Sequence, residues 1–153
     1  MRTPYRIAAV IAAVLCALTA AGQPAAADAR LDPHTWLSGQ RVQAPGGPAI
    51  YLVDPEGYRR WIPDPATYDN LFRNWDGVIQ DPHLGLIPER DALTSGAFLA
   101  IAQPRPQVYL VSNGVKRWIT SPAVMDKYNF SWEKIQKVSP LVLDAVPEGA
   151  PWS

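Results

Sequence analysis

Residues 108–122 read VYLVSNGVKRWITSP, and this stretch decides the fold. Asn113-Gly114 at its centre is the strongest short signal for a two-residue type I′ hairpin turn, because both central residues of that turn need a positive φ. Ser121 followed by Pro122 is typical of a helix start, with serine at the N-cap and proline at the first helical position. The stretch therefore predicts a β-hairpin in which Tyr109 faces Trp118, followed directly by a short helix.

The same pattern occurs earlier in the chain, about 57 residues away. The segments IYLV (50–53), RWI (60–62) and DPA (64–66) match VYLV (108–111), RWI (117–119) and SPA (121–123). Self-similarity at a fixed spacing indicates repeated supersecondary units. We therefore predict two repeats, at about 37–93 and 94–153.

The hairpin loop of the first copy is one residue longer. Its sequence Asp54-Pro55-Glu56-Gly57 suits a three-residue loop in which Pro55 opens a type I turn and Gly57 takes the left-handed position. Counting outward from either turn gives one register. Tyr51 should face Trp61 as Tyr109 faces Trp118, and Leu52 should face Arg60 as Leu110 faces Arg117.

A short amphipathic helix should follow each hairpin. Asp64-Pro65 repeats the cap and first-turn signal of Ser121-Pro122. The predicted apolar stripes are Tyr68, Leu71 and Phe72 in one helix, and Val124, Met125 and Tyr128 in the other. Further helical turns are expected near residues 74, 81, 131 and 139, and leading strands within 39–42 and 96–101.

These elements define an α+β fold with short antiparallel strands and short helices. An isolated hairpin is only marginally stable in water. We therefore expect the two tandem hairpin–helix repeats to pack about a pseudo-twofold axis as one small domain, residues 28–153.

The motif VYLVxNGxKRWIxSP, followed by a tryptophan, resembles a short repeat of bacterial, actinobacterial-type extracellular proteins. The resemblance covers about 45–90 and 104–150. The first copy departs from the motif at Arg59-Arg60 and Pro63-Asp64. Such repeats occur alone, in tandem, or beside cell-wall and hydrolase domains. The resemblance implies an uncharacterised secreted accessory module and no named reaction.

Residues 1–27 have the features of a secretory signal peptide. Arg2 and Arg6 precede an apolar run that ends in small residues, and cleavage is expected after Ala27. Cys16, the single cysteine, lies inside this run and lacks the small preceding residue of a lipidation site. We therefore predict a secreted, extracellular protein that is free of disulfides and has no membrane attachment after cleavage.

Charge and composition exclude several classes of function. The chain has 14 Lys+Arg and 14 Asp+Glu, and without Arg2 and Arg6 the balance is 12 − 14 = −2. This is not the basic surface of a nucleic-acid-binding protein. Only two histidines are present, His34 and His83, each beside a proline and without a nucleophile motif. We expect no enzyme activity, no metal and no cofactor.

The aromatic and basic residues of the hairpins are the candidate ligand-binding residues. They are Tyr51, Arg59 and Trp61 in the first copy, and Tyr109, Lys116 and Trp118 in the second. Strand alternation places each trio on one face, opposite the Ile/Leu face that should form the core. In a small domain such tryptophans more often belong to the core. If exposed, they would provide a binding platform. Trp75 and Trp132 are expected in the core.

The leading functional hypothesis is a non-enzymatic binding module for cell-wall or other extracellular polysaccharide. Two weak sites on one polymer would gain from avidity. The alternative is a protein-interaction or inhibitor module that acts on a secreted protein, since Trp, Tyr and Arg are enriched at protein interfaces. A monomer is expected in either case.

Overall fold

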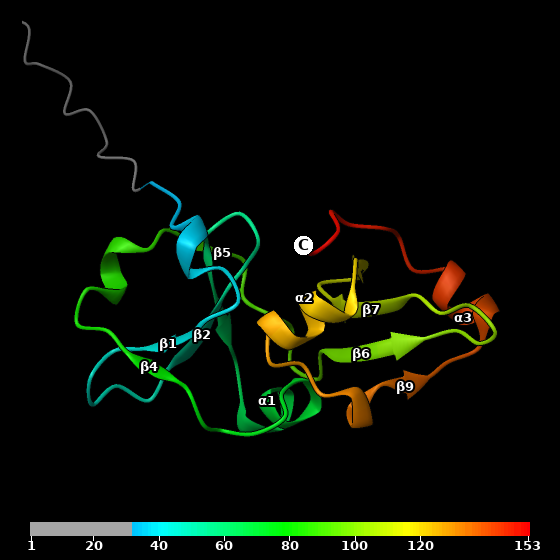
Figure 1. Cartoon of the computed structure of the whole chain (residues 1–153), viewed down its shortest axis with the longest axis horizontal. Helices are drawn as coiled ribbons and strands as arrows, with labels where there is room; N and C mark the ends of the chain where they lie inside the picture. The colour runs from blue at the N-terminus through cyan, green and yellow to red at the C-terminus, as the bar shows by residue number, and fades with distance from the viewer. Residues whose placement is uncertain (1–31) are drawn as a thin grey trace, which may run out of the picture.

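The computed structural model describes residues 32–153 and shows a mixed α+β fold with two small sheets and short helices (Figure 1). The first sheet lies on the left of Figure 1 and the second on the right, with α1 and α2 between them. The α+β class expected from the sequence is confirmed. The signal peptide expected at 1–27 and Cys16 lie outside the described residues.

The first sheet has five strands in the order β4-β1-β2-β3-β5. Its strands are β1 (Arg41–Gln43), β2 (Ile50–Val53), β3 (Arg59–Ile62), β4 (Ile79–Gln80) and β5 (Glu89–Arg90). The inner pairs β1–β2 and β2–β3 are antiparallel, and the β2–β3 hairpin is the one predicted from the sequence. The two short outer strands pair in parallel with their neighbours, which the sequence reading missed.

The second sheet has four strands in the order β8-β7-β6-β9. Its strands are β6 (Phe98–Ile101), β7 (Val108–Ser112), β8 (Val115–Ile119) and β9 (Gln136–Lys137). The C-terminal tail lies beside β8, where Glu148 and Trp152 form parallel bridges with Lys116 and Ile119. The tail thus lies beside β8 as β5 lies beside β3.

Both predicted hairpins form with the predicted register. Tyr51 pairs with Trp61 across β2–β3, and Tyr109 pairs with Trp118 across β7–β8. Leu52 and Arg60 are also partners, as are Leu110 and Arg117. Asn113 and Gly114 have φ of 57° and 69°, as a type I′ turn requires, and Gly57 is left-handed with φ of 86°. Two different turns therefore set one register.

The helices are short and begin where the capping signals place them. They are α1 (Pro65–Leu71), α2 (Pro122–Lys127) and α3 (Pro140–Asp144), with 3₁₀ turns η1 (Thr35–Leu37), η2 (Leu84–Leu86) and η3 (Trp132–Lys134). The Asp64 side chain accepts from Thr67 N at the start of α1, and Ser121 accepts from Val124 N at the start of α2. The helical turn expected near residue 74 does not form.

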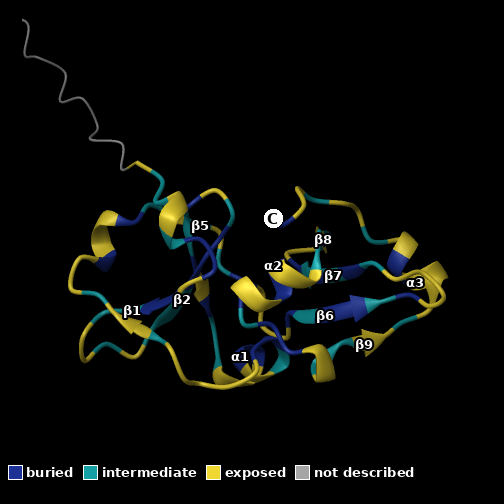
Figure 2. Cartoon of the chain, viewed as in Figure 1, coloured by how far each residue is buried: buried dark blue, intermediate teal, exposed yellow. Residues whose placement is uncertain are grey.

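One hydrophobic cluster joins the two halves of the chain. It contains Leu52, Ile62 and the stripe of α1 together with Leu99, Leu110, Ile119 and the stripe of α2. At its centre Phe72 and Phe130 form an antiparallel bridge, and their rings stack at 5.6 Å. Buried positions from both sheets and from α1 and α2 meet in this region (Figure 2). The expected Ile/Leu core face is therefore correct.

The opposite face of each sheet is covered in part. Tyr51 packs against a second cluster of Val42, Val53, Leu84 and Ile87. Tyr109 packs against a third cluster of Ala100, Ala102 and Leu143. Tyr51 and Tyr109 are therefore only partly exposed, because η2 and α3 supply apolar side chains that pack against them.

Candidate functional site

The two hairpin tryptophans are the exposed aromatic residues of the sheets. Trp61 and Trp118 each keep 42% of their surface accessible. They occupy the same register position, next to the last residue of β3 and of β8. The sequence left open whether these rings are buried in the core or partly exposed, and the structure shows them partly exposed. Burial of these rings in the core, the commoner arrangement, is wrong here.

Two further tryptophans are exposed, and the expectation that they are core residues is wrong. Trp75 and Trp132 keep 47% and 46% of their surface accessible. Trp75 lies in an irregular segment after α1, and Trp132 opens the single turn η3. These segments lie on the outside of the core, and one turn cannot surround a ring as large as indole. The recurrence of tryptophan in both copies was the signal that could have identified them.

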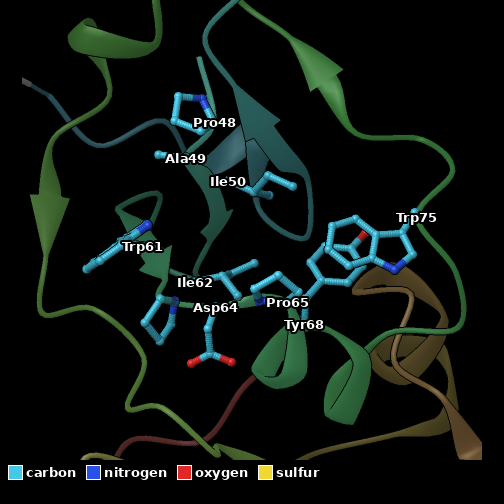
Figure 3. Close-up of a pocket in the computed structure, with 10 residues that line it drawn as sticks. Pro48, Ala49, Ile50, Trp61, Ile62, Asp64, Pro65, Tyr68 and Trp75 are labelled. Carbon is cyan, nitrogen blue, oxygen red and sulfur yellow. The ribbon is translucent and has the colours of Figure 1, made fainter. Parts of the chain in front are cut away.

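Trp61 and Trp75 stand at opposite ends of one shallow cleft (Figure 3). Ile50, Ile62 and Pro65 lie between them, and the cleft has a volume of about 260 Å³. The complete lining is Pro48, Ala49, Ile50, Trp61, Ile62, Pro63, Asp64, Pro65, Tyr68 and Trp75. The cleft thus has an apolar floor with an indole ring at each end.

A second cleft of about 380 Å³ lies against β8 and α2. Its lining is Pro106, Gln107, Val108, Trp118, Ile119, Thr120, Ser121, Pro122, Met125 and Trp132. In sequence alignment these ten positions correspond one to one with those of the first cleft. Trp118 and Trp132 take the places of Trp61 and Trp75. The chain therefore builds one kind of cleft twice.

The first cleft holds Trp75 firmly. Its indole ring stacks on Tyr68 with ring centroids 3.9 Å apart and 19° between the planes. Its Nε1 donates to Asp69 Oδ1 at 2.8 Å. Burial raises the pKa of the Tyr68 hydroxyl, which donates to Asn74 O at 3.0 Å and so anchors the segment that carries Trp75. These contacts hold Trp75 in place at one end of the cleft.

The second cleft is more polar. Met125 replaces Tyr68, so Trp132 has no stacked tyrosine beneath it. Gln107, Thr120 and Ser121 replace Ala49, Pro63 and Asp64. The Gln107 Oε1 atom is buried without a hydrogen-bond partner among the described residues. The second cleft therefore offers neutral hydrogen-bonding groups that the first lacks.

The carboxylate of the first cleft has structural partners. Asp64 accepts from Thr67 N at 2.7 Å, Thr67 Oγ1 at 3.0 Å and Ser95 Oγ at 2.7 Å. The Ser95 hydroxyl and the Thr67 amide hold the pKa of this carboxyl below its usual range. Asp64 is therefore an ionised cap at the edge of the cleft.

The predicted basic residues do not belong to the clefts. Arg59 donates to Leu84 O and to Glu89 Oε2, and its guanidinium lies 5.1 Å from the Tyr51 ring centre. Lys116 is buried and donates from Nζ to Leu143 O at 2.9 Å, beside Tyr109. These contacts connect η2 and β5 to β3, and α3 to β8. Of the six candidate residues, only Trp61 and Trp118 line a cleft.

His83 is exposed and its nearest carboxylate is Asp81, at 3.7 Å. The described residues contain no group of three or more metal-ligating side chains. Nor does any helix in this part of the chain have the length and hydropathy to cross a bilayer.

Comparison with known proteins gave no family model, no curated protein and no solved structure that matches this chain. The clefts are therefore the feature from which a function can be inferred. A flat indole at each end of an apolar floor can hold a planar or ring-shaped group by stacking, with polar groups at the edge to orient it.

Proposed function

We propose that this chain is a secreted, non-enzymatic module that binds cell-wall or other extracellular polysaccharide through its two tryptophan clefts. The observation that carries the proposal is the duplicated lining, in which all ten positions correspond and each cleft has two half-exposed tryptophans. Large exposed rings gathered in one place mark interaction sites on soluble proteins.

The proposal includes the architecture that creates two clefts. Two tandem hairpin–helix repeats related by a pseudo-twofold axis would place equivalent residues in equivalent surroundings. The equal registers of β2–β3 and β7–β8, and the matching positions that line the two clefts, support this arrangement.

Sugars fit the chemistry of these clefts. A pyranose ring presents apolar C–H groups on its faces and hydroxyls around its edge. The faces can stack on Trp61, Trp75, Trp118 and Trp132, while groups such as Thr120 and Ser121 can bond hydroxyls. Each shallow cleft would bind weakly, and two on one polymer would raise the apparent affinity by avidity.

The protein-interaction or inhibitor alternative has less support. It would be favoured by a projecting loop at Asp54-Pro55-Glu56-Gly57. Gly57 O instead accepts from His34 N at 2.9 Å, and Asp54 is buried against Arg60. The loop is therefore packed against neighbouring segments.

The decisive experiment is retention of the protein on insoluble peptidoglycan, chitin and cellulose, compared among tryptophan variants. Trp61→Ala and Trp118→Ala should each weaken retention about tenfold, the equivalent of about 1.4 kcal/mol of lost stacking. The double variant should abolish it. Trp75→Ala and Trp132→Ala should weaken retention in the same direction.

Trp36→Ala is the matched control. Trp36 is 72% exposed and stacks on His34, outside both clefts. Its loss should leave retention unchanged, and thermal melting should show that each variant is folded. If the folded double variant binds as the wild type does, or if no polymer retains the wild type, the polysaccharide proposal is wrong and a protein partner becomes the next hypothesis.

A further inference from the structure

A second kind of pocket lies where the first half of the chain meets the C-terminal tail. Its volume is about 170 Å³. Three arginines from three strands line it: Arg60 of β3, Arg90 of β5 and Arg117 of β8. The rest of the lining is Asp54, Pro55, Glu56, Ala150, Pro151 and Trp152. Three cations thus face two carboxylates, which leaves an excess of one positive charge.

Two of the arginines are neutralised by the chain itself. Arg60 donates from Nε to Asp54 Oδ2 at 2.9 Å and from Nη1 to Asp91 O at 3.1 Å. Arg90 pairs with Glu56 at 2.5 Å, and its guanidinium lies 3.7 Å from the centre of the Tyr58 ring. Both acidic residues of the pocket are therefore already engaged.

Arg117 is the arginine without a carboxylate. Within residues 32–153 no acidic side chain lies within 4.0 Å of it, and its hydrogen bond is a long one of 3.2 Å from Nη1 to Ser112 O. Its partial burial and the nearby charge of Arg60 lower its pKa. The carboxylates of Asp54 and Asp91 act in the opposite direction on this pKa, but they offset the burial and the Arg60 charge only in part. The charge of Arg117 is therefore incompletely balanced, and proteins normally pair such charges.

The first hairpin has a carboxylate, Asp54, at a position where the second hairpin has none. Asp54 follows β2 directly and lies on the same face as Arg60, two positions from its cross-strand partner Leu52. Ser112 occupies the equivalent position on β7, two residues from Leu110, the partner of Arg117. The carboxylate that balances Arg60 has therefore been replaced by a hydroxyl beside Arg117.

We propose that this pocket binds an oxyanion, a carboxylate or a phosphate or sulfate group, on Arg117. The five N–H groups of a guanidinium form a planar fork that matches such oxygens, and one of them has a partner here. The pocket has room for several water-sized groups, enough for an oxyanion with a short stem. Asp54 and Glu56 limit the site to a single anionic group.

The site is independent of the tryptophan clefts, because no residue lines both this pocket and either cleft. Its failure would leave the polysaccharide proposal unaffected, and the reverse also holds. An anion here would connect β8 with the segment Ala150–Trp152 and with β5, so binding should also stabilise the fold.

The test is a titration of the protein with sodium acetate, phosphate and sulfate, at an ionic strength held constant with sodium chloride. The Arg117 Nε–H resonance and the amides of Ala150 and Trp152 would be followed by NMR, together with the melting temperature. Saturable shifts in the millimolar range are expected. A response to acetate alone assigns a carboxylate, and a response to phosphate and sulfate assigns a tetrahedral anion.

Two variants make the test specific. Arg117→Gln removes the fork and should abolish the shifts at Ala150 and Trp152. Ser112→Asp keeps Arg117 and supplies the carboxylate that the first hairpin already has, so it should weaken anion binding at least tenfold. Arg105→Gln is the matched control, because it removes an exposed arginine that pairs with Asp144 elsewhere.

The proposal would be overturned if the wild-type spectra responded no more to the three oxyanions than to chloride. Saturable shifts that persist unchanged in folded Ser112→Asp and Arg117→Gln would overturn it as well, since the anion would then be bound elsewhere.

Discussion

The two hairpins have the same register and hold it by different chemistry. In the first, the buried Asp54 carboxylate accepts from the amides of Glu56 and Tyr58, each at 3.0 Å, and from Arg60. In the second, the turn depends on the left-handed conformations of Asn113 and Gly114. Strand pairing is thus the same in both hairpins, although the turn and its polar partners differ.

The largest loss of stability should come from removing the charge of Asp54 in the first turn. Asp54→Asn keeps an oxygen for the two loop amides and leaves the Arg60 guanidinium without its anion. Breaking a buried ion pair in this way costs about 3–5 kcal/mol. Asp54 and Arg60 are 1% and 8% exposed, so solvent cannot replace the lost partner well. Urea unfolding of the variant and the wild type measures the difference.

Ser112→Ala is the matched change in the second hairpin. The Ser112 hydroxyl accepts from Thr94 N at 3.0 Å and donates to Asn113 Oδ1 at 2.6 Å, and neither partner is charged. Its loss should cost only about 1–2 kcal/mol, because both lost hydrogen bonds are to neutral groups and the exposed Asn113 side chain can turn to water. Equal losses in the two variants would show that the ion pair contributes no more than a neutral hydrogen bond.

The next largest difference in stability is expected between alanine variants of the two turn glycines, Gly57 and Gly114. A Cβ on Gly57 would lie 2.5 Å from the backbone nitrogens of His34 and Thr35, whereas a Cβ on Gly114 would meet no atom within 4 Å. Gly114→Ala should therefore cost about 1–2 kcal/mol from its positive φ alone. Gly57→Ala should cost clearly more, since the segment at His34 must also move.

Thermal melting of the two glycine variants decides between these expectations. If Gly57→Ala and Gly114→Ala lose the same stability, the contact between the first turn and residues 34–35 contributes nothing. A wild-type-like Gly114→Ala would instead contradict the type I′ assignment.

Local signals explain why much of the fold could be predicted from the sequence. The turns at Gly57 and Asn113-Gly114 and the caps at Asp64 and Ser121 depend on neighbouring residues only, and all four are confirmed. Strand register followed from the turns by counting. The parallel pairings of β4, β5 and β9 were missed, because two-residue strands have no periodicity to detect.

The site was only half predictable, for the same reason. Strand alternation correctly put Trp61 and Trp118 apart from the Ile/Leu core. It could not show that η2 covers Tyr51, or that Lys116 reaches the end of α3 to bond Leu143 O. These contacts join segments far apart in the chain. Long-range packing also determines that Trp75 completes a cleft instead of filling the core.

The smallest expected effect is a difference in how the two helix caps make stability depend on pH. Asp64 at α1 can be titrated, and Ser121 at α2 cannot. The hydrogen bonds from Ser95 and Thr67 lower the pKa of Asp64 below its ordinary value of 3.8. A carboxyl whose pKa is lower in the folded state binds fewer protons there than in the unfolded chain, so stability rises with pH across this range.

The cap contribution of Asp64 should therefore be fully present above about pH 4 and should be lost as the pH falls through the lowered pKa. Asp64→Ser gives α1 the cap of α2, and the melting temperature of this variant should depend less on pH below 4 than that of the wild type. At neutral pH the two proteins should differ little, since serine and aspartate cap helices about equally well. If the melting temperatures of both proteins fall equally as the pH is lowered, other carboxyls, such as Asp144 beside Arg105, determine the loss of stability in acid.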